Sequence, residues 1–234
     1  MEKQKTASVE IKAGSRFLGL YDIEAGPIKG DMGSMYMAHH SDWNMDLAII
    51  LPYAHKFRTT ARKNAFIREC VTWINLGLHP NIVSCYYIRN IGGIPVIFSE
   101  WMDEGSLKDW IENKKLYEGT KEEIKERIFD IAIQYARGLK YLHEKGLVCR
   151  DLKPENLLMN SEGKAKILAF GRTKAIKFST KNRKNLTAKS DIGNWAAAVL
   201  GMYGIEYNTK LDGIDAGIVL NEYFKKSEVK PVRR

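Results

Sequence analysis

The chain has 234 residues, which is enough for one domain or for two lobes packed together, and its composition is ordinary for a soluble globular protein. Its three cysteines form no Cys-x-x-Cys pair and leave an odd thiol, which argues against a disulfide framework and against a zinc site built on cysteines. No apolar stretch is long enough to span a bilayer, and the first residues lack a signal-peptide core, so we expect a cytoplasmic protein.

The formal net charge of +9 is concentrated in two segments. Seven basic residues and no acidic one lie between Arg172 and Lys189, and five more basic residues lie in 225–234. Such runs are most often solvated, and binding to an anionic partner is the alternative. No aromatic side chains are interleaved in the way that stacking on nucleic-acid bases requires, which disfavours a nucleic-acid partner.

The first hundred residues are predicted to be mainly short strands interrupted by one helix. The runs with strand character are 17–21, 34–39, 46–51 and 86–89. In the helix, Thr60 is the predicted cap and Leu76-Gly77 the predicted end. The apolar face of this helix consists of Phe66, Cys70, Trp73 and Ile74.

The pattern becomes helical after Trp101. Ser106 and Asp109 have the spacing of a capping box. A long helix follows and ends at Gly146, with apolar residues every three or four positions: Ile124, Ile128, Ile131, Tyr135, Leu139 and Leu142. Short strands are predicted at 147–148, 157–159 and 165–168. The last helix is predicted from about Asp191 to Tyr203, with Ile192, Trp195, Ala196, Val199 and Leu200 facing inward.

These elements indicate an α+β chain, with a β-rich lobe joined to a helical lobe and a ligand cleft expected between them. The histidines (His39, His40, His55, His79 and His143) have no spacing typical of metal ligands, so we expect them at the surface or in loops. Trp73 and Phe170 are expected in the core.

The most specific string is Cys-Arg-Asp-Leu-Lys-Pro-Glu-Asn at 149–156, followed thirteen residues after Asn156 by Ala169-Phe170-Gly171. Both strings resemble motifs of the protein kinase family, the catalytic loop His-Arg-Asp…Asn and the triplet Asp-Phe-Gly. Lys153, two residues after Asp151, resembles the serine/threonine branch. Leu142-His143, just upstream, resembles the residues that precede the catalytic loop in the family.

Upstream landmarks of the family occur in the expected register. Gly30 and Gly33 resemble the glycine loop over the phosphates, and 47–50 occupies the position of Val-Ala-Ile-Lys. Glu69 lies in the helix that supplies the partner of that lysine in the family. His-Pro-Asn-Ile-Val at 79–83 is another family string. Glu100 to Met102 correspond to the hinge, with Ser99 before it, and the resemblance covers 17–204.

The resemblance implies a bilobal protein kinase-like fold with a β-rich N-lobe and a helical, abbreviated C-lobe. The predicted bounds are an N-terminal extension at 1–16, the N-lobe at 17–99, the hinge at 100–105, the C-lobe core at 106–204 and a basic tail at 205–234. Asp191 follows Ala169 by only twenty-two positions, with no Ala-Pro-Glu between them, so we expect a shortened peptide-docking segment. Only thirty-one residues follow Tyr203, so we expect either an abbreviated C-lobe or one that a partner covers.

Residue roles follow from the same resemblance. The catalytic positions are Asp151, Lys153 and Asn156, and Asn156 is the one retained metal ligand. The nucleotide-binding positions are Gly30, Gly33, Ala48, Ile50, Glu69, Glu100, Met102 and Leu158. Three positions depart from the family: Ile50 replaces the lysine, Ala169 the metal-binding aspartate, and Cys149 the loop histidine.

These replacements predict a pseudokinase that binds ATP weakly and with little help from Mg²⁺, and that acts by binding a protein partner. An alternative is an ATP-dependent serine/threonine kinase of low activity with a rearranged cation site, for which Lys29 is a candidate. A third is an inert remnant or a laboratory variant.

Overall fold

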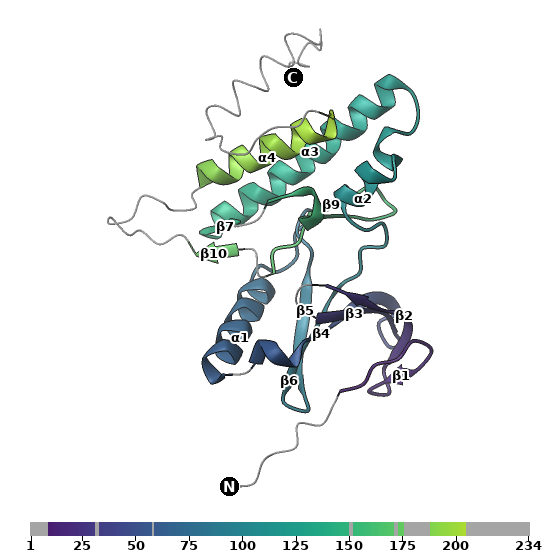
Figure 1. Cartoon of the computed structure of the whole chain (residues 1–234), viewed down its shortest axis with the longest axis vertical. Helices are drawn as coiled ribbons and strands as arrows, with labels where there is room; N and C mark the ends of the chain where they lie inside the picture. The colour runs from purple at the N-terminus through teal and green to yellow at the C-terminus, as the bar shows by residue number, and fades with distance from the viewer. Residues whose placement is uncertain are drawn as a thin grey trace, which may run out of the picture. The chain divides into compact units, whose positions relative to one another are not determined.

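The computed structural model describes residues 9–30, 33–57, 59–149, 152–170, 173–175 and 188–204. The chain divides into two compact units (Figure 1). One comprises Met1–Leu78 and Val83–Trp101, and the other comprises His79–Ile82 and Met102–Arg234. The first is rich in strands and the second in helices, which agrees with the α+β, bilobal protein kinase-like fold class predicted from the sequence.

The β-rich unit is built on an antiparallel sheet of six strands in the order β1-β2-β3-β4-β6-β5. The strands are β1 (Arg16–Phe17), β2 (Tyr21–Lys29), β3 (Gly33–His40), β4 (Met45–Pro52), β5 (Cys85–Ile91) and β6 (Ile94–Glu100). The runs at 34–39, 46–51 and 86–89 are therefore strands, as predicted. The strand predicted at 17–21 is wrong, because Leu18 and Gly19 have φ of 53° and 68° and make a turn between β1 and β2.

One face of the sheet carries the core of this unit. Along β2, Tyr21 and Ile23 are buried while Asp22 and Glu24 are exposed, the alternation expected of a half-buried strand. Leu47 and Ile49 of β4 continue the buried face and are fully excluded from solvent. The sequence analysis did not identify β6 or most of β2, both of which contain a proline.

Helix α1 (Thr60–Asn75) packs against β5 and follows a short 3-10 turn, η1 (Ala54–Phe57). Its cap is Thr59, whose hydroxyl accepts the Arg62 N–H at 3.2 Å, so the predicted cap was one residue too late. Phe66, Cys70 and Trp73 are buried, as predicted. The helix ends at Leu76 and Gly77, where Gly77 takes a φ of 66°.

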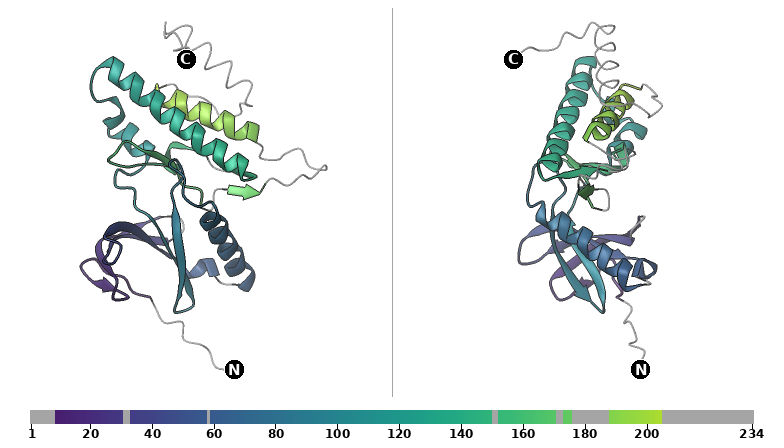
Figure 2. Two further views of the ribbon diagram at one scale, coloured as in Figure 1. Left: turned by 180° about the vertical axis from the view of Figure 1, so that it is seen from behind. Right: turned by 90° about the vertical axis from the view of Figure 1, so that its left-hand side faces the viewer.

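The helical unit contains three helices and two small sheets among the described residues. The helices are α2 (Leu107–Glu112), α3 (Lys121–Glu144) and α4 (Ala188–Met202), with short 3-10 turns η2 (Lys115–Tyr117) and η3 (Pro154–Asn156). Strand β7 (Leu147–Cys149) pairs with β10 (Thr173–Ala175), and β8 (Leu157–Met159) pairs with β9 (Ala165–Ile167). Helices α3 and α4 lie side by side (Figure 2). No helix in the described ranges is both long and apolar enough to cross a membrane.

The helix ends of this unit are capped by residues that are close in sequence. Ser106 and Asp109 form the predicted capping box at α2, and Thr120 with Glu123 forms a second one at α3. Gly146 has a φ of 70° just after α3. The inward orientation predicted for Ile192 is wrong, because its side chain is 44% exposed on α4.

His40 also departs from the prediction of a surface histidine. Only 3% of it is exposed, because its ring stacks on Trp43 at 4.3 Å and meets the edge of Tyr21 at 5.1 Å. The Trp43 backbone N–H donates to His40 Nδ1 at 3.2 Å, which closes the turn between β3 and β4. The His40 ring is thus buried in an aromatic cluster, with its Nδ1 accepting a hydrogen bond.

Gly138 on α3 is predicted to be required by packing. A Cβ there would lie 2.6 Å from the Asn81 carbonyl oxygen and 2.8 Å from Ile167 Cδ1. We expect Gly138→Ala to lower the free energy of unfolding by about 1–3 kcal/mol, as overpacking does. Gly201→Ala on α4, where a Cβ has open space, is the matched control and should be neutral or stabilising by up to about 1 kcal/mol. Urea denaturation measures both, and equal effects would contradict the prediction.

Candidate functional site

The glycine pair of the β-rich unit lies at the turn between β2 and β3. The Gly30 N–H donates to the Gly33 carbonyl at 3.0 Å, which closes this hairpin. Gly33 is buried opposite Pro52 of β4, and a Cβ on it would lie 2.1 Å from the Leu51 carbonyl oxygen. Gly33 is therefore needed for the close approach of two strands, whatever it does toward a phosphate. Asp31 and Met32 lie outside the described residues.

Ala48 and Ile50 follow on β4. Ala48 is 2% exposed and pairs with Met37 and Ser99 in the neighbouring strands. Ile50 is half-buried, with Met35 opposite it on β3 and Ile97 opposite it on β6. Directly opposite residues on adjacent strands share a face, so the Ile50 position has hydrocarbon on both sides.

The two acidic residues predicted for nucleotide binding in this unit have different surroundings. Glu69 is exposed on α1 and makes no ion pair with any described residue. Glu100 is half-buried, and its Oε2 accepts the Ser84 N–H at 3.1 Å while its own N–H donates to the Ser84 carbonyl at 2.9 Å. The Glu100 side chain thus ties the end of β6 to the segment before β5.

In the helical unit, Lys153 immediately precedes the turn η3 and Asn156 ends it. The Asn156 N–H donates to the Lys153 carbonyl at 2.9 Å, and the Asn156 carbonyl accepts the Leu168 N–H at 2.9 Å. Asn156 is 4% exposed, whereas Lys153 is exposed. The structure therefore holds Asn156 against the segment that leads into Ala169.

Backbone pairing brings β8, which carries Leu158, beside the segment 104–106. Leu158 is half-buried on β8 and forms an isolated bridge with Ser106. The Met159 N–H donates to the Gly105 carbonyl at 2.8 Å, and the Glu104 N–H donates to the Met159 carbonyl at 3.2 Å. Met102, which precedes this segment, is 7% exposed.

Ala169 and Phe170 are both buried, with exposures of 1% and 5%. The core position predicted for Phe170 is confirmed. The Ala169 methyl group offers no donor atom to a cation. Asp151, the predicted catalytic acid, lies outside the described residues together with Arg150 and Gly171.

A buried carboxylate supports the backbone just before the predicted catalytic loop. Asp191 is fully buried at the start of α4, and its Oδ2 accepts the Cys149 N–H at 2.9 Å and lies 2.8 Å from His143 Nε2. Burial raises the pKa of Asp191, while the hydrogen bonds to His143 and Cys149 act in the opposite direction. The sequence analysis named all three residues but did not predict that they meet.

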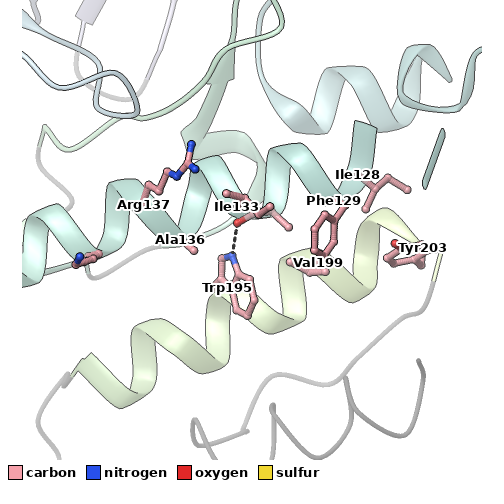
Figure 3. Close-up of a pocket in the computed structure, with 10 residues that line it drawn as sticks. Ile128, Phe129, Ile133, Ala136, Arg137, Trp195, Val199 and Tyr203 are labelled. Carbon is pink, nitrogen blue, oxygen red and sulfur yellow. Dashed lines mark hydrogen bonds between the residues drawn. The ribbon is translucent and has the colours of Figure 1, made fainter. Parts of the chain in front are cut away.

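Two hollows of the helical unit lie apart from the predicted site residues. A groove of about 420 Å³ between α3 and α4 is lined mainly by apolar side chains, and the Trp195 Nε1–H in its wall donates to the Ala132 carbonyl at 3.0 Å (Figure 3). A polar hollow of about 460 Å³ includes His79, Arg137 and Glu162. Neither contains Lys153, Asn156 or Leu158.

The sequence was compared with known families, and the model described as "Protein kinase domain" matches residues 28–231. The chain belongs to the protein kinase family. The match covers most of the sequence and includes every predicted site residue from Gly30 to Leu158. The family generally binds ATP and Mg²⁺, whereas what this chain binds depends on its own residues.

Several kinases are similar to this chain. A mitogen-activated protein kinase kinase 1 of Arabidopsis thaliana is 32% identical over 88% of this chain and 55% of its own length. The serine/threonine/tyrosine-protein kinase HT1 of the same plant is 31% identical over 72% of this chain and 41% of its own length. A probable serine/threonine-protein kinase of Streptomyces coelicolor is 31% identical over 69% of this chain and 24% of its own length. The matched region thus spans about a quarter to about half of these relatives.

Asp191→Ala should be among the more damaging single changes in the helical unit. It leaves the buried Cys149 N–H without its acceptor and removes the partner of His143, so we expect a loss of about 2–4 kcal/mol in the free energy of unfolding. Glu126→Ala, an exposed acid on α3 that makes no ion pair within the described ranges, is the control and should stay within about 0.5 kcal/mol. Chemical denaturation followed by circular dichroism gives both values. A loss as small as that of the control would show that the buried carboxylate is dispensable.

Proposed function

We propose that this protein kinase-family chain is a pseudokinase, with phosphoryl transfer lost or strongly reduced, that acts by binding a protein partner. The observation that carries the proposal is the presence of hydrocarbon at two positions where phosphoryl transfer needs charge, Ile50 and Ala169. Catalysis of this reaction consists largely of positioning and of neutralising phosphate charge.

Ile50 removes the cation that would contact the α- and β-phosphates. Its nearest cross-strand partners, Met35 and Ile97, are also apolar, so the strand offers no substitute at this position. Glu69, the family partner of the absent lysine, is exposed and has no cation paired with it among the described residues. A preorganised charge at a developing transition state is worth about 10²–10³ in rate, and this site has lost one.

Ala169 removes a second charge. A carboxylate at this position would hold the metal ion that bridges the phosphates, and a buried methyl group cannot. Asn156 stays in place beside it through the hydrogen bond from the Leu168 N–H, so one neutral metal ligand remains. We therefore propose that nucleotide binding, where it occurs, is weak and depends little on Mg²⁺.

The retained residues support one alternative. Asp151, Lys153 and Asn156 keep the sequence of an active loop, and Gly30 and Gly33 keep the hairpin closed. A kinase of low activity, with a cation supplied from another position such as Lys29, would use these residues. Lys29 is exposed at the end of β2, opposite Ser34.

Two features favour a macromolecular partner over a small substrate. Ile67 and Val71, one turn apart on the outer face of α1, are 38% and 47% exposed. The basic segment 172–189 and the basic tail have the charge to bind an anionic surface on that partner. Most residues of both segments lie outside the described residues. We also propose a cytoplasmic location and the domain bounds predicted from the sequence.

Phosphoryl transfer provides the first test. The protein incubated with γ-labelled ATP and Mg²⁺ or Mn²⁺ should label itself and a generic acceptor protein no more than an Asp151→Asn variant does. The matched variant isolates transfer that depends on the catalytic loop from contaminating activity. Transfer above the level of Asp151→Asn would establish the low-activity kinase instead.

Nucleotide binding provides the second test. Adding Mg²⁺ to ATP should change the melting temperature of the unaltered chain by less than about 1 °C. In the double variant Ile50→Lys/Ala169→Asp, which restores both charges, Mg²⁺-ATP should raise it by about 3 °C or more. A large Mg²⁺-dependent rise in the unaltered chain would contradict the proposed loss of the cation site.

A further inference from the structure

Three neighbouring strands of the β-rich unit bring a histidine and three carboxylates together on one face. His39 of β3 pairs with Asp22 of β2 on one side and with Asp46 of β4 on the other. Glu24 lies two residues beyond Asp22, so its side chain points to the same side of the sheet. The buried residues of β2 alternate with these acids, which places the group on the outer face.

The donor atoms of Glu24, His39 and Asp46 all lie within 4.8 Å of one another. His39 Nδ1 lies 2.8 Å from Asp46 Oδ1, a hydrogen-bond distance. No other group of three potential metal ligands this close occurs within the described ranges. The ligands come from separate strands, which explains why histidine spacing in the sequence predicted no metal site.

The charge balance of this patch favours a cation. Asp22 is engaged by Arg16 at 3.6 Å and by the Ser41 hydroxyl, whereas Glu24 has no ion pair or hydrogen bond to any described residue. Asp46 and Glu24 together carry two negative charges around a single imidazole. A chain with a net charge of +9 thus keeps a locally acidic group whose second carboxylate is uncompensated.

We propose that Glu24, His39 and Asp46 form a binding site for a divalent transition-metal ion, with Zn²⁺ as the best match. One imidazole and two carboxylates are an accepted ligand set for zinc, and water would complete a tetrahedral arrangement. Ligand distances of about 2.0–2.2 Å require the His39–Asp46 pair to open slightly and the Glu24 carboxylate to move toward it. Mg²⁺ fits less well, because it prefers oxygen ligands alone.

A metal ion here would bridge β2, β3 and β4 and so stabilise the sheet that carries Gly30, Gly33 and Ile50. The site is independent of the proposed loss of phosphoryl transfer, because none of its ligands belongs to the predicted catalytic or nucleotide-binding set. Its binding energy would appear as added stability of the folded chain.

The test is calorimetric titration of the untagged, chelator-treated chain with ZnCl₂ at neutral pH. We expect one Zn²⁺ per chain, with affinity reduced about ten-fold or more in each of Glu24→Gln, His39→Gln and Asp46→Asn. His55→Gln and Glu126→Gln, which change an exposed histidine and an exposed acid elsewhere, should leave the affinity unchanged.

Two further readouts separate a built site from nonspecific binding. Zn²⁺ should raise the melting temperature of the unaltered chain and not that of His39→Gln, and a chelator should reverse the rise. Co²⁺ should give visible absorption bands that the three ligand variants lose. The absence of binding, or binding that persists in His39→Gln, would overturn the proposal. Circular dichroism of each variant confirms that the sheet is intact, so a misfolded variant is not mistaken for a lost ligand.

Discussion

The helical unit depends on one buried carboxylate that joins three separate stretches of the chain. Asp191 lies in the first turn of α4, His143 in the last turn of α3 and Cys149 at the end of β7, and one carboxylate oxygen of Asp191 contacts the other two residues. Burial of an ionisable group costs free energy, and the two contacts of Asp191 Oδ2 offset this cost only in part, since burial still raises the pKa of Asp191. The end of β7, just before the predicted catalytic loop, is thereby anchored to α4.

Residues that maintain the fold can be distinguished from residues that would supply charge to a reaction. Residues with a backbone or packing task are in place: Gly33 admits the close approach of β4, Asn156 holds the Leu168 N–H, and Phe170 is buried. Of the three positions that depart from the family motifs, Ile50 and Ala169 stand where the family has charged residues, whereas Cys149 is a buried residue of β7. Replacing a charge by hydrocarbon in a half-buried site removes a desolvation cost, so such losses need not destabilise the fold. Hydrocarbon at Ile50 and Ala169 is therefore compatible with a folded kinase domain.

Much of the fold could be predicted because its signals are local. Three examples are the capping box of Ser106 and Asp109, the apolar face of α3 and the end of that helix at Gly146. In each signal, the residues that interact are close in sequence. The predictions failed where local pattern and tertiary context disagree. Proline is unfavourable inside a strand, yet Pro27 lies in β2 and Pro95 in β6, which are paired with neighbouring strands of the sheet. Ile192 has the spacing of a core residue but lies on the solvent side of α4.

Contacts between residues that are distant in sequence were not predicted for the site either. The spacing of motifs predicted site roles for Lys153, Asn156 and Ala169. It did not predict the contacts of Asp191 with His143 and Cys149, nor the group formed by Glu24, His39 and Asp46. Both depend on the register of strands or helices that are distant in sequence, and single-sequence patterns carry no register. A one-residue shift of β3 against β4 would turn His39 toward the core and His40, now packed against Trp43, toward solvent. The aromatic packing of His40 is thus what places His39 beside Asp46, so a core interaction determines the chemistry of the opposite face.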